Sequence, residues 1–178
     1  LLFVWRLSEQ KWIKYLIQAM QDIVKKYPDT KLLVVWYWPL EKDLQKQAKS
    51  LNLEQNIIFT WAIENKQLPR YYATADIFIS PSINEWFWLV YIESILSWCI
   101  SIWVNNWWTT DIIKDWETWF LIKQKDSDDI AEKVLKSFEN NDFDKQKARK
   151  TIQEKFSWDV IWEKYFNLFK NQEKWNKN

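Results

Sequence analysis

Short apolar runs alternate with amphipathic segments along nearly all of this 178-residue chain. The runs LLVV and DIFI are continuously apolar, as strands buried on both faces of a parallel sheet are. Between such runs, apolar residues recur at helical spacing, for example at Ile13, Leu16, Ile17 and Met20. The alternation predicts βαβ units, and therefore an α/β fold: a Rossmann-like three-layer α/β/α sandwich with about six parallel strands.

The pattern places these elements along one domain over 1–171, followed by a solvated tail at 172–178. Ligands of open α/β sheets bind at the carboxyl ends of the strands, so candidate site residues should follow each strand directly. We expect strands at 1–5, 31–36, 56–60, 76–80, 99–103 and 119–123. We expect helices at 13–24, 39–51, 68–73, 88–97, 110–114, from a cap at Asp126 or Ser127 to 139, at 143–155 and at 158–171.

Composition excludes several classes of site. The formal net charge of +1 gives no overall bias toward nucleic acid or an anionic membrane. The chain has no histidine, which excludes a Ser-His-Asp triad and a histidine metal centre within it. Its one cysteine, Cys99, excludes an internal disulfide and a cysteine-based zinc site. No apolar run approaches the ~20 residues of a membrane span and no signal-peptide pattern is present, so we expect a cytoplasmic protein.

Two residue counts are abnormal: the chain has no glycine and sixteen tryptophans. Average usage of about 7% would give roughly a dozen glycines in this length. The tryptophans fall at strand ends and turns, where glycine supplies positive φ and close backbone approaches. This placement argues against a merely aromatic-rich core, and a tryptophan platform for stacking on sugars fits it poorly. We interpret most of these positions as glycine sites written as tryptophan.

Charged residues follow two of the predicted strands. Arg6 and Lys11 lie before a helix N-terminus, a combination suited to a diphosphate, although a solvated basic pair would look the same. Glu85 lies in the loop after the fourth strand, and Glu93 lies within the next helix. A loop carboxylate can accept hydrogen bonds from sugar hydroxyls, and one in the helix can hold a vicinal diol such as a ribose. Two unrelated surface acids would give the same spacing.

With tryptophan standing for glycine, the chain resembles the C-terminal, donor-binding domain of a GT-B retaining glycosyltransferase of family four, the group 1 glycosyltransferases. The resemblance spans nearly all of 1–171, and its motifs occur in the family's order and spacing. They are FVWRLSEQKW, LVVWYWP, PSINEWFWLVYIES, WWTTDIIKDWETWFLI and FSWDVIWEKYFNLF. The family's N-terminal domain, which supplies the acceptor site, does not occur in these residues. The chain begins at Leu1 on a strand-like run, so we expect a piece of a longer protein.

The resemblance implies a role for each candidate residue. Arg6 and Lys11 would bind the diphosphate of a nucleotide-sugar as it leaves, and Glu85 would contact the donor hexose. Glu93 would hold the ribose hydroxyls. The remaining donor contacts would come from Phe87, from the backbone amides of Trp88 and Leu89, and from Ile63 near the base. No metal or other cofactor is needed if two cations and a helix N-terminus neutralise the diphosphate.

The resemblance also identifies which tryptophans stand at family glycine positions. One origin is deliberate substitution. Another is a gene whose UGA codons mean glycine, as in some uncultured bacterial lineages, translated by a table that reads UGA as tryptophan. The Lys-, Ile- and Asn-rich composition favours the second origin, and UGA at these codons with UGG at Trp158 would support it. The positions are Trp5, Trp12, Trp36, Trp38, Trp61, Trp86, Trp88, Trp98, Trp107, Trp108, Trp116 and Trp119.

The expected function is therefore transfer of a hexosyl unit from a nucleotide-diphosphate sugar, with retention, by an enzyme of which this domain is the donor-binding half. The expected partners are the nucleotide-sugar donor and the N-terminal GT-B domain, through which any peripheral membrane contact would be made, and we expect no nucleic acid. Two alternatives stay open: a non-catalytic, aromatic-rich carbohydrate-binding module, and a GT-B nucleotide-sugar epimerase, which the Glu85–Glu93 signature disfavours. With literal tryptophans, we expect this fragment to be inactive alone.

Overall fold

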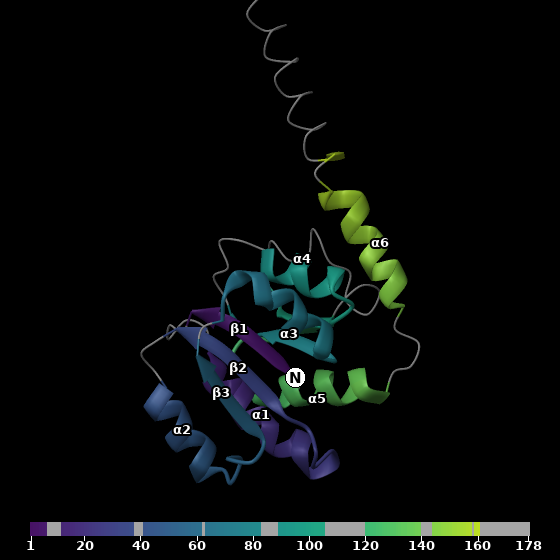
Figure 1. Ribbon diagram of the computed structural model, residues 1–178. Helices are drawn as coiled ribbons and strands as arrows, with labels where there is room; N and C mark the ends of the chain where they lie inside the picture. The colour runs from purple at the N-terminus through teal and green to yellow at the C-terminus, as the bar shows by residue number, and fades with distance from the viewer. Residues whose placement is uncertain are drawn as a thin grey trace, which may run out of the picture.

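Six strands form one parallel sheet in the described part of the chain, which comprises residues 1–6, 12–37, 41–61, 63–82, 89–105, 120–139, 144–157 and 159–160 of a computed structural model (Figure 1). The strand order is β3-β2-β1-β4-β5-β6, so the direction of winding reverses between β1 and β4. The expected Rossmann-like fold is confirmed. The strands are β1 (Leu2–Arg6), β2 (Leu32–Tyr37), β3 (Ile57–Trp61), β4 (Ile77–Ser80), β5 (Ile100–Val104) and β6 (Phe120–Ile122).

Helices cover both faces of this sheet (Figure 1). Helices α1, α2 and α5 pack on one face, and α3, α4 and α6 pack on the other. None of the helices within the described ranges is long and apolar enough to cross a bilayer. The helices are α1 (Ile13–Lys26), α2 (Glu41–Ser50), α3 (Leu68–Thr74), α4 (Leu89–Leu96), α5 (Ser127–Glu139) and α6 (Lys145–Phe156), and the short 3₁₀ helix η2 (Asn65–Gln67) precedes α3.

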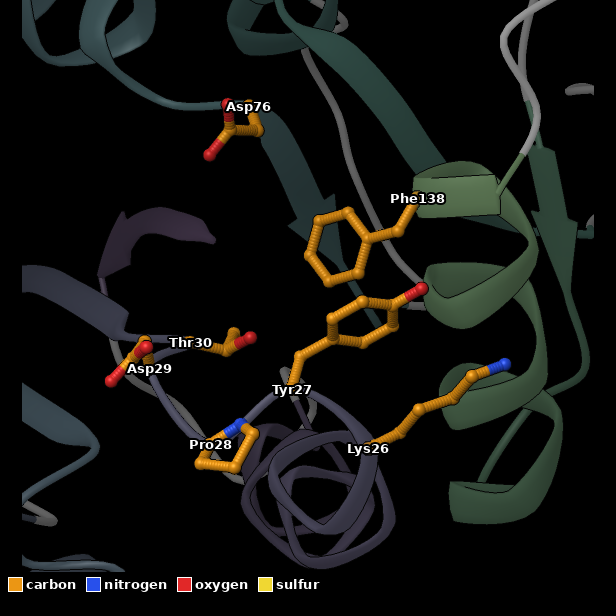
Figure 2. A pocket seen from close by; sticks show the side chains of 7 residues that line it. All are labelled: Lys26, Tyr27, Pro28, Asp29, Thr30, Asp76 and Phe138. Atoms are coloured by element: carbon orange, nitrogen blue, oxygen red, sulfur yellow. The ribbon is translucent and has the colours of Figure 1, made fainter.

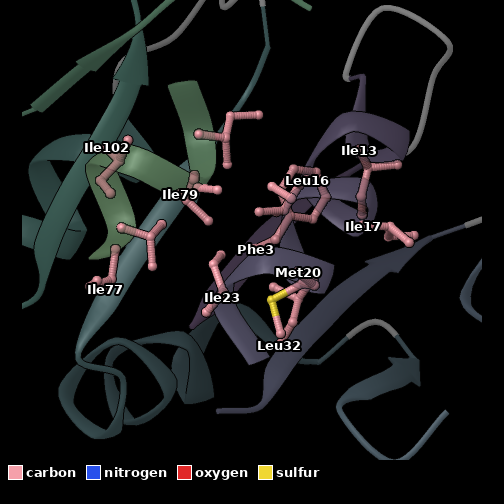
Figure 3. Close-up of a cluster of buried hydrophobic side chains, with 14 of the residues drawn as sticks. Phe3, Ile13, Leu16, Ile17, Met20, Ile23, Leu32, Ile77, Ile79 and Ile102 are labelled. Atoms are coloured by element: carbon pink, nitrogen blue, oxygen red, sulfur yellow. The ribbon is translucent and has the colours of Figure 1, made fainter. Parts of the chain in front are cut away.

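Alternation along the strands supplies one apolar core to each face of the sheet. In β4, Ile77 and Ile79 face the α1 side, where they join the cluster shown in Figure 3, whereas Phe78 faces the α3 and α4 side. Helix α1 contributes the expected stripe, with Leu16 and Met20 fully buried. Because every strand is covered on both faces, the apolar runs are continuous rather than alternating.

Two helix starts are fixed by aspartate caps. The Oδ1 atom of Asp126 accepts a 2.9 Å hydrogen bond from the amide of Asp129, so Asp126 rather than Ser127 caps α5. The Oδ1 atom of Asp144 likewise accepts a 2.9 Å bond from the amide of Lys147 at the start of α6. Each cap satisfies an amide that the helix itself leaves without a partner. The caps define α5 and α6 within two residues of the expected ranges.

The observed elements differ from the expected ones by one or two residues at most ends, which is the usual uncertainty of element boundaries. Helix α3 is preceded by η2, which the sequence pattern did not indicate. The expected helix at 110–114, the tail at 172–178 and most of the helix at 158–171 lie outside the described residues.

Two helices end with the same backbone geometry but with different residues. At the end of α4, the amide of Cys99 donates to the carbonyl of Ser94 at 3.0 Å, and the intervening Trp98 has φ 68°. At the end of α2, the amide of Leu53 donates to the carbonyl of Ala48 at 2.9 Å, and Asn52 has φ 56°. Glycine is the usual residue at this left-handed position and asparagine is the usual substitute. Trp98 therefore stands at a position whose backbone favours glycine.

We expect Trp98→Gly to stabilise the chain. Glycine removes the strain of a left-handed backbone, which is about 1–2 kcal/mol. The change also removes the contact of the Arg149 guanidinium with the Trp98 ring, whose centroid is 4.6 Å away, and this contact is worth about 0.5–1 kcal/mol. The expected net gain is about 0–1.5 kcal/mol in the free energy of unfolding, measured in urea. Asn52→Gly is the matched control and should change stability by only a few tenths of a kcal/mol. A Trp98→Gly variant less stable than its parent would contradict a glycine-favouring site.

Candidate functional site

The winding reversal between β1 and β4 marks the edge of the sheet where a ligand site is expected. Strand β1 ends at Arg6 and strand β4 ends at Ser80, and the two strands are parallel neighbours. Their carboxyl ends therefore lie at the same edge of the sheet, in its centre. Helix α1 follows β1 and helix α4 follows β4, so both helix N-termini lie at this edge as well. This is the position where open α/β sheets bind nucleotides.

Three of the tryptophans that we interpret as glycine positions form one row across the sheet close to this edge. The register pairs Trp5 of β1 with Trp36 of β2, and Trp36 with Trp61 of β3. Glycine in such a row leaves the backbone open to a closely approaching ligand. The sequence positions are 25 or more residues apart, so only the parallel register brings them together.

Trp12 occupies the residue just before α1. It has φ 49° and ψ 29°, a left-handed conformation, and its side chain makes no capping hydrogen bond. The Nζ atom of Lys125 lies 4.1 Å from its ring centroid. An uncapped helix N-terminus keeps free amides that suit an anion. Trp12 is thus a second tryptophan whose backbone conformation favours glycine.

Glu93 lies one turn into α4, and that helix is fixed to the sheet by a buried polar contact. The Oγ atoms of Ser94 and Ser101 are 2.5 Å apart, and the Ser94 hydroxyl also donates to the carbonyl of Tyr91 at 2.8 Å. On the same helix, Tyr91 packs its ring 3.8 Å from that of Trp103 in β5. These contacts hold α4 in place and therefore define where Glu93 lies at the carboxyl edge.

The Glu93 side chain is exposed on its outer side but carries a perturbed carboxyl group. Partial burial raises the pKa of Glu93 above its usual value, and the hydroxyl of Tyr72 on α3 lowers that pKa in the opposite direction. Burial dominates, so the folded chain holds the ionised carboxylate less easily than the unfolded chain does. A carboxyl group with a shifted pKa at the carboxyl edge of the sheet is a candidate functional group.

We expect Glu93→Gln to stabilise the chain near neutral pH. Since the pKa of Glu93 is raised on folding, its contribution to stability is complete below the unfolded value, ordinarily 4.5, and is lost as the pH rises through the folded value. Glutamine has no such loss. The thermal midpoint of the variant should therefore exceed that of the parent at pH 7 and match it near pH 4. A gap that widens toward low pH would contradict the sign of the shift.

The structure brings part of the predicted site together. Arg6 ends β1, Leu89 begins α4, and Glu93 lies one turn further along that helix. Ile63, just after β3, is half-buried and packs on the core cluster that includes Tyr72. Lys11, Glu85, Phe87 and Trp88 lie outside the described residues, so their predicted roles stay predictions.

Sequence reasoning missed Tyr72. The sequence offers two adjacent tyrosines, Tyr71 and Tyr72, in a short helix before β4. Only the packing of α3 against α4 and the sheet shows that Tyr72 is buried, with its ring 5.5 Å from that of Phe78. In so short a helix, the spacing of the apolar residues does not show which of the two tyrosines is buried.

A separate pocket lies at the opposite edge of the sheet from the candidate site, and Figure 2 shows the side chains that line it. Thr30 and Asp76 line it, and they precede β2 and β4 respectively, so it opens at the amino ends of the strands. Tyr27 and Phe138 meet there edge to face, with ring centroids 5.1 Å apart. Within the described ranges, no group of three or more His, Cys, Asp or Glu residues is placed to hold a metal ion.

Comparison with known proteins identifies the family. The model of the family "Glycosyl transferases group 1" matches residues 1–156. The chain belongs to the group 1 glycosyltransferases. Its fold is that of the C-terminal domain of their GT-B architecture, as the resemblance of its sequence motifs predicted.

Several relatives of this glycosyltransferase domain are longer proteins, and the chain matches only part of their length. An uncharacterized glycosyltransferase of Methanocaldococcus jannaschii is 28% identical over 173 residues, which are 96% of this chain and 44% of the relative. A crystal structure of the S. aureus protein TarM in complex with UDP and other ligands has 25% identity and a TM-score of 0.84, over 94% of this chain and 35% of TarM. The C-terminal domain of LpcC, a group 1 family protein from Francisella tularensis, has 26% identity and a TM-score of 0.74, over 92% and 84%. The chain thus spans under half the length of the curated relative.

Proposed function

We propose that this domain binds the donor in a glycosyltransferase that moves a hexosyl unit from a nucleotide-diphosphate sugar to an acceptor with retention at the anomeric carbon. The observation that carries the proposal is the convergence of Arg6, the start of α1 and Glu93 at the winding reversal of a group 1 glycosyltransferase domain. In the reaction, the bond between the anomeric carbon and the diphosphate oxygen breaks, and a bond to an acceptor oxygen forms. The acceptor site would lie in the N-terminal half that GT-B relatives carry.

The leaving diphosphate needs positive charge at the end of β1. Arg6 offers a planar fork of donors, and Lys11 in the segment between β1 and α1 offers a compact ammonium group. The α1 N-terminus adds amides and a favourable dipole. Together they can neutralise charge that develops on the leaving group, which is how group transfer proceeds without a bound metal.

The rest of the donor would extend toward α4 and β3. Glu93 would accept hydrogen bonds from the two ribose hydroxyls, and Ile63 would offer an apolar surface for the base. Glu85, with Phe87 and the backbone amides of Trp88 and Leu89, would contact the hexose and the phosphate. The UDP bound in the TarM structure, whose fold matches this domain closely, supports a nucleotide diphosphate as ligand.

The proposal is tested by titration calorimetry with UDP and GDP, with and without EDTA, and with a free oligosaccharide. Both the chain as printed and a form with glycine at the twelve positions are titrated, because indoles would fill the space of the ligand. We expect the glycine form to bind one of the nucleotides equally well in EDTA. Oligosaccharide binding without nucleotide binding would instead favour a carbohydrate-binding module and overturn the proposal.

A further inference from the structure

Tyr72 presents a buried hydroxyl that needs an acceptor. Its side chain is 1% exposed, and its hydroxyl makes no hydrogen bond within the described part of the chain. The ring itself is well packed, edge to face on Phe78, which in turn meets Tyr91 of α4 with centroids 5.8 Å apart. A buried hydroxyl without a partner destabilises the folded chain, because it has lost its hydrogen bonds to water. Phenylalanine would fill the same space without that cost, so the hydroxyl calls for an explanation other than packing.

A charged acceptor that acts on that hydroxyl is the carboxylate of Glu93. Helices α3 and α4 pack against each other, Tyr72 from α3 and Glu93 from α4. Each group acts on the other: burial first, and then the Glu93 carboxylate, raise the pKa of Tyr72, and the Tyr72 hydroxyl lowers the pKa of Glu93. The two groups therefore interact across the contact between α3 and α4, although the Tyr72 hydroxyl has no partner in the described part of the chain at a full hydrogen-bond geometry.

We propose that Tyr72 is a positioning residue, whose hydroxyl donates to one Glu93 carboxylate oxygen when a nucleotide occupies the site and leaves the other oxygen for the ribose. This rests on the proposed function of Glu93. A tyrosine hydroxyl is a good partner because it can donate a hydrogen bond to the carboxylate, and because its buried ring holds it in place. The contact would hold the carboxylate rotamer in the complex, and because the Tyr72 ring is already fixed by packing, the ordering cost of binding stays low.

The other charged groups described on the elements that pack against α4 interact with residues other than Glu93. From α6, the Arg149 guanidinium lies over the Trp98 ring, and Lys145 acts on the pKa of Cys99. From β5, the neighbour is the uncharged Ser101. Besides burial, the Tyr72 hydroxyl is the described group that changes the pKa of Glu93.

The test compares Tyr72→Phe with Tyr71→Phe, the same change at the adjacent residue of α3. Two measurements are made on the full chain, in whichever form binds UDP. The first is the titration of the Glu93 carboxyl by carbon-13 NMR, which needs no ligand. The second is the affinity for UDP and for 2′-deoxy-UDP as a function of pH.

We expect Tyr72→Phe to move the Glu93 titration to higher pH, since the hydroxyl that lowers its pKa is gone. UDP affinity should fall about three- to tenfold, the loss of one hydrogen bond, and the ratio of UDP to 2′-deoxy-UDP affinity should shrink toward one. Loss of affinity on acidification should begin at higher pH than in the parent. Tyr71→Phe should leave all of these unchanged, and neither variant should lower the thermal midpoint.

Two failures are distinguishable. If the parent binds UDP but Tyr72→Phe alters neither the Glu93 titration nor the discrimination against 2′-deoxy-UDP, the positioning role is wrong and the proposed function stands. If neither form of the chain binds nucleotide, the proposed function fails. The NMR titration then tests only the contact between Tyr72 and Glu93. An unchanged Glu93 titration in Tyr72→Phe overturns the contact, and a shifted titration supports the contact but overturns its role in ribose binding.

Discussion

Glycine at the twelve tryptophan positions is expected to raise the free energy of unfolding and to restore nucleotide binding together. Trp12 and Trp98 both have left-handed backbones, at φ 49° and φ 68°. Relief of their strain alone is worth about 1–2 kcal/mol each. Overpacking at other positions adds typically about 1–3 kcal/mol per site. A folded domain is typically stable by only about 5–15 kcal/mol. The summed gains are of similar size, so we expect the glycine form to fold well and the printed chain to fold poorly.

The binding gain has a separate cause. Trp5, Trp36 and Trp61 stand in register beside the carboxyl edge, and Trp12 stands directly before α1. Glycine at each place opens backbone to the ligand. We expect no UDP binding by the printed chain and clear binding by the glycine form, measured by calorimetry, with a higher urea midpoint for the glycine form.

Trp103 supplies the matched control for this experiment. It is 1% exposed and stacks on Tyr91, and it is not among the twelve positions. Trp103→Gly should therefore destabilise the chain by about 3–5 kcal/mol, as loss of a buried aromatic ring does. If the twelve-glycine form unfolds at lower urea than the printed chain, the glycine interpretation is wrong. The gene gives an independent check, because UGG at all of these codons would exclude a reassigned UGA.

Removal of either cation of the diphosphate site is the second large effect expected. In the glycine form, Arg6→Ala and Lys11→Ala should each weaken binding of a nucleoside diphosphate by roughly tenfold to a hundredfold. Each removes a charged hydrogen-bond donor, worth about 1.5–3 kcal/mol. Glu93→Gln should weaken binding by less, because it keeps a neutral acceptor for the ribose. Calorimetry with UDP, in buffer containing EDTA, measures all three.

Lys25→Ala is the charge-matched control for these variants. Lys25 lies in the last turn of α1, at the far end from the diphosphate site, and pairs with Asp22 at 2.6 Å on the exposed surface. Such an exposed pair contributes little, so the variant should bind as the parent does. If both Arg6→Ala and Lys11→Ala bind as well as the parent, or if EDTA abolishes binding, the diphosphate site is assigned wrongly.

The sequence predicted the fold because each of its signals is local. The apolar runs of β1, β2 and β4 and the stripe of α1 are set by a few neighbouring residues, and burial on both sheet faces makes those runs continuous. The start of α5 was predicted to within one residue, since an aspartate cap acts on an amide three residues away. Arg6 and Glu93 were predicted as site residues from their places after strands, and the structure puts both positions at the carboxyl edge of the sheet.

Tertiary structure decided what depends on distant segments meeting. The strand order alone places β1 beside β4 and so creates the winding reversal, and the parallel register alone aligns Trp5, Trp36 and Trp61. Likewise, the choice of Tyr72 over Tyr71 as the buried tyrosine comes from α3 packing on α4 and the sheet. Periodicity determines which face of a segment is apolar, because that depends on side chains a few residues apart. It does not determine which other segment covers that face, because that depends on the packing of the whole chain.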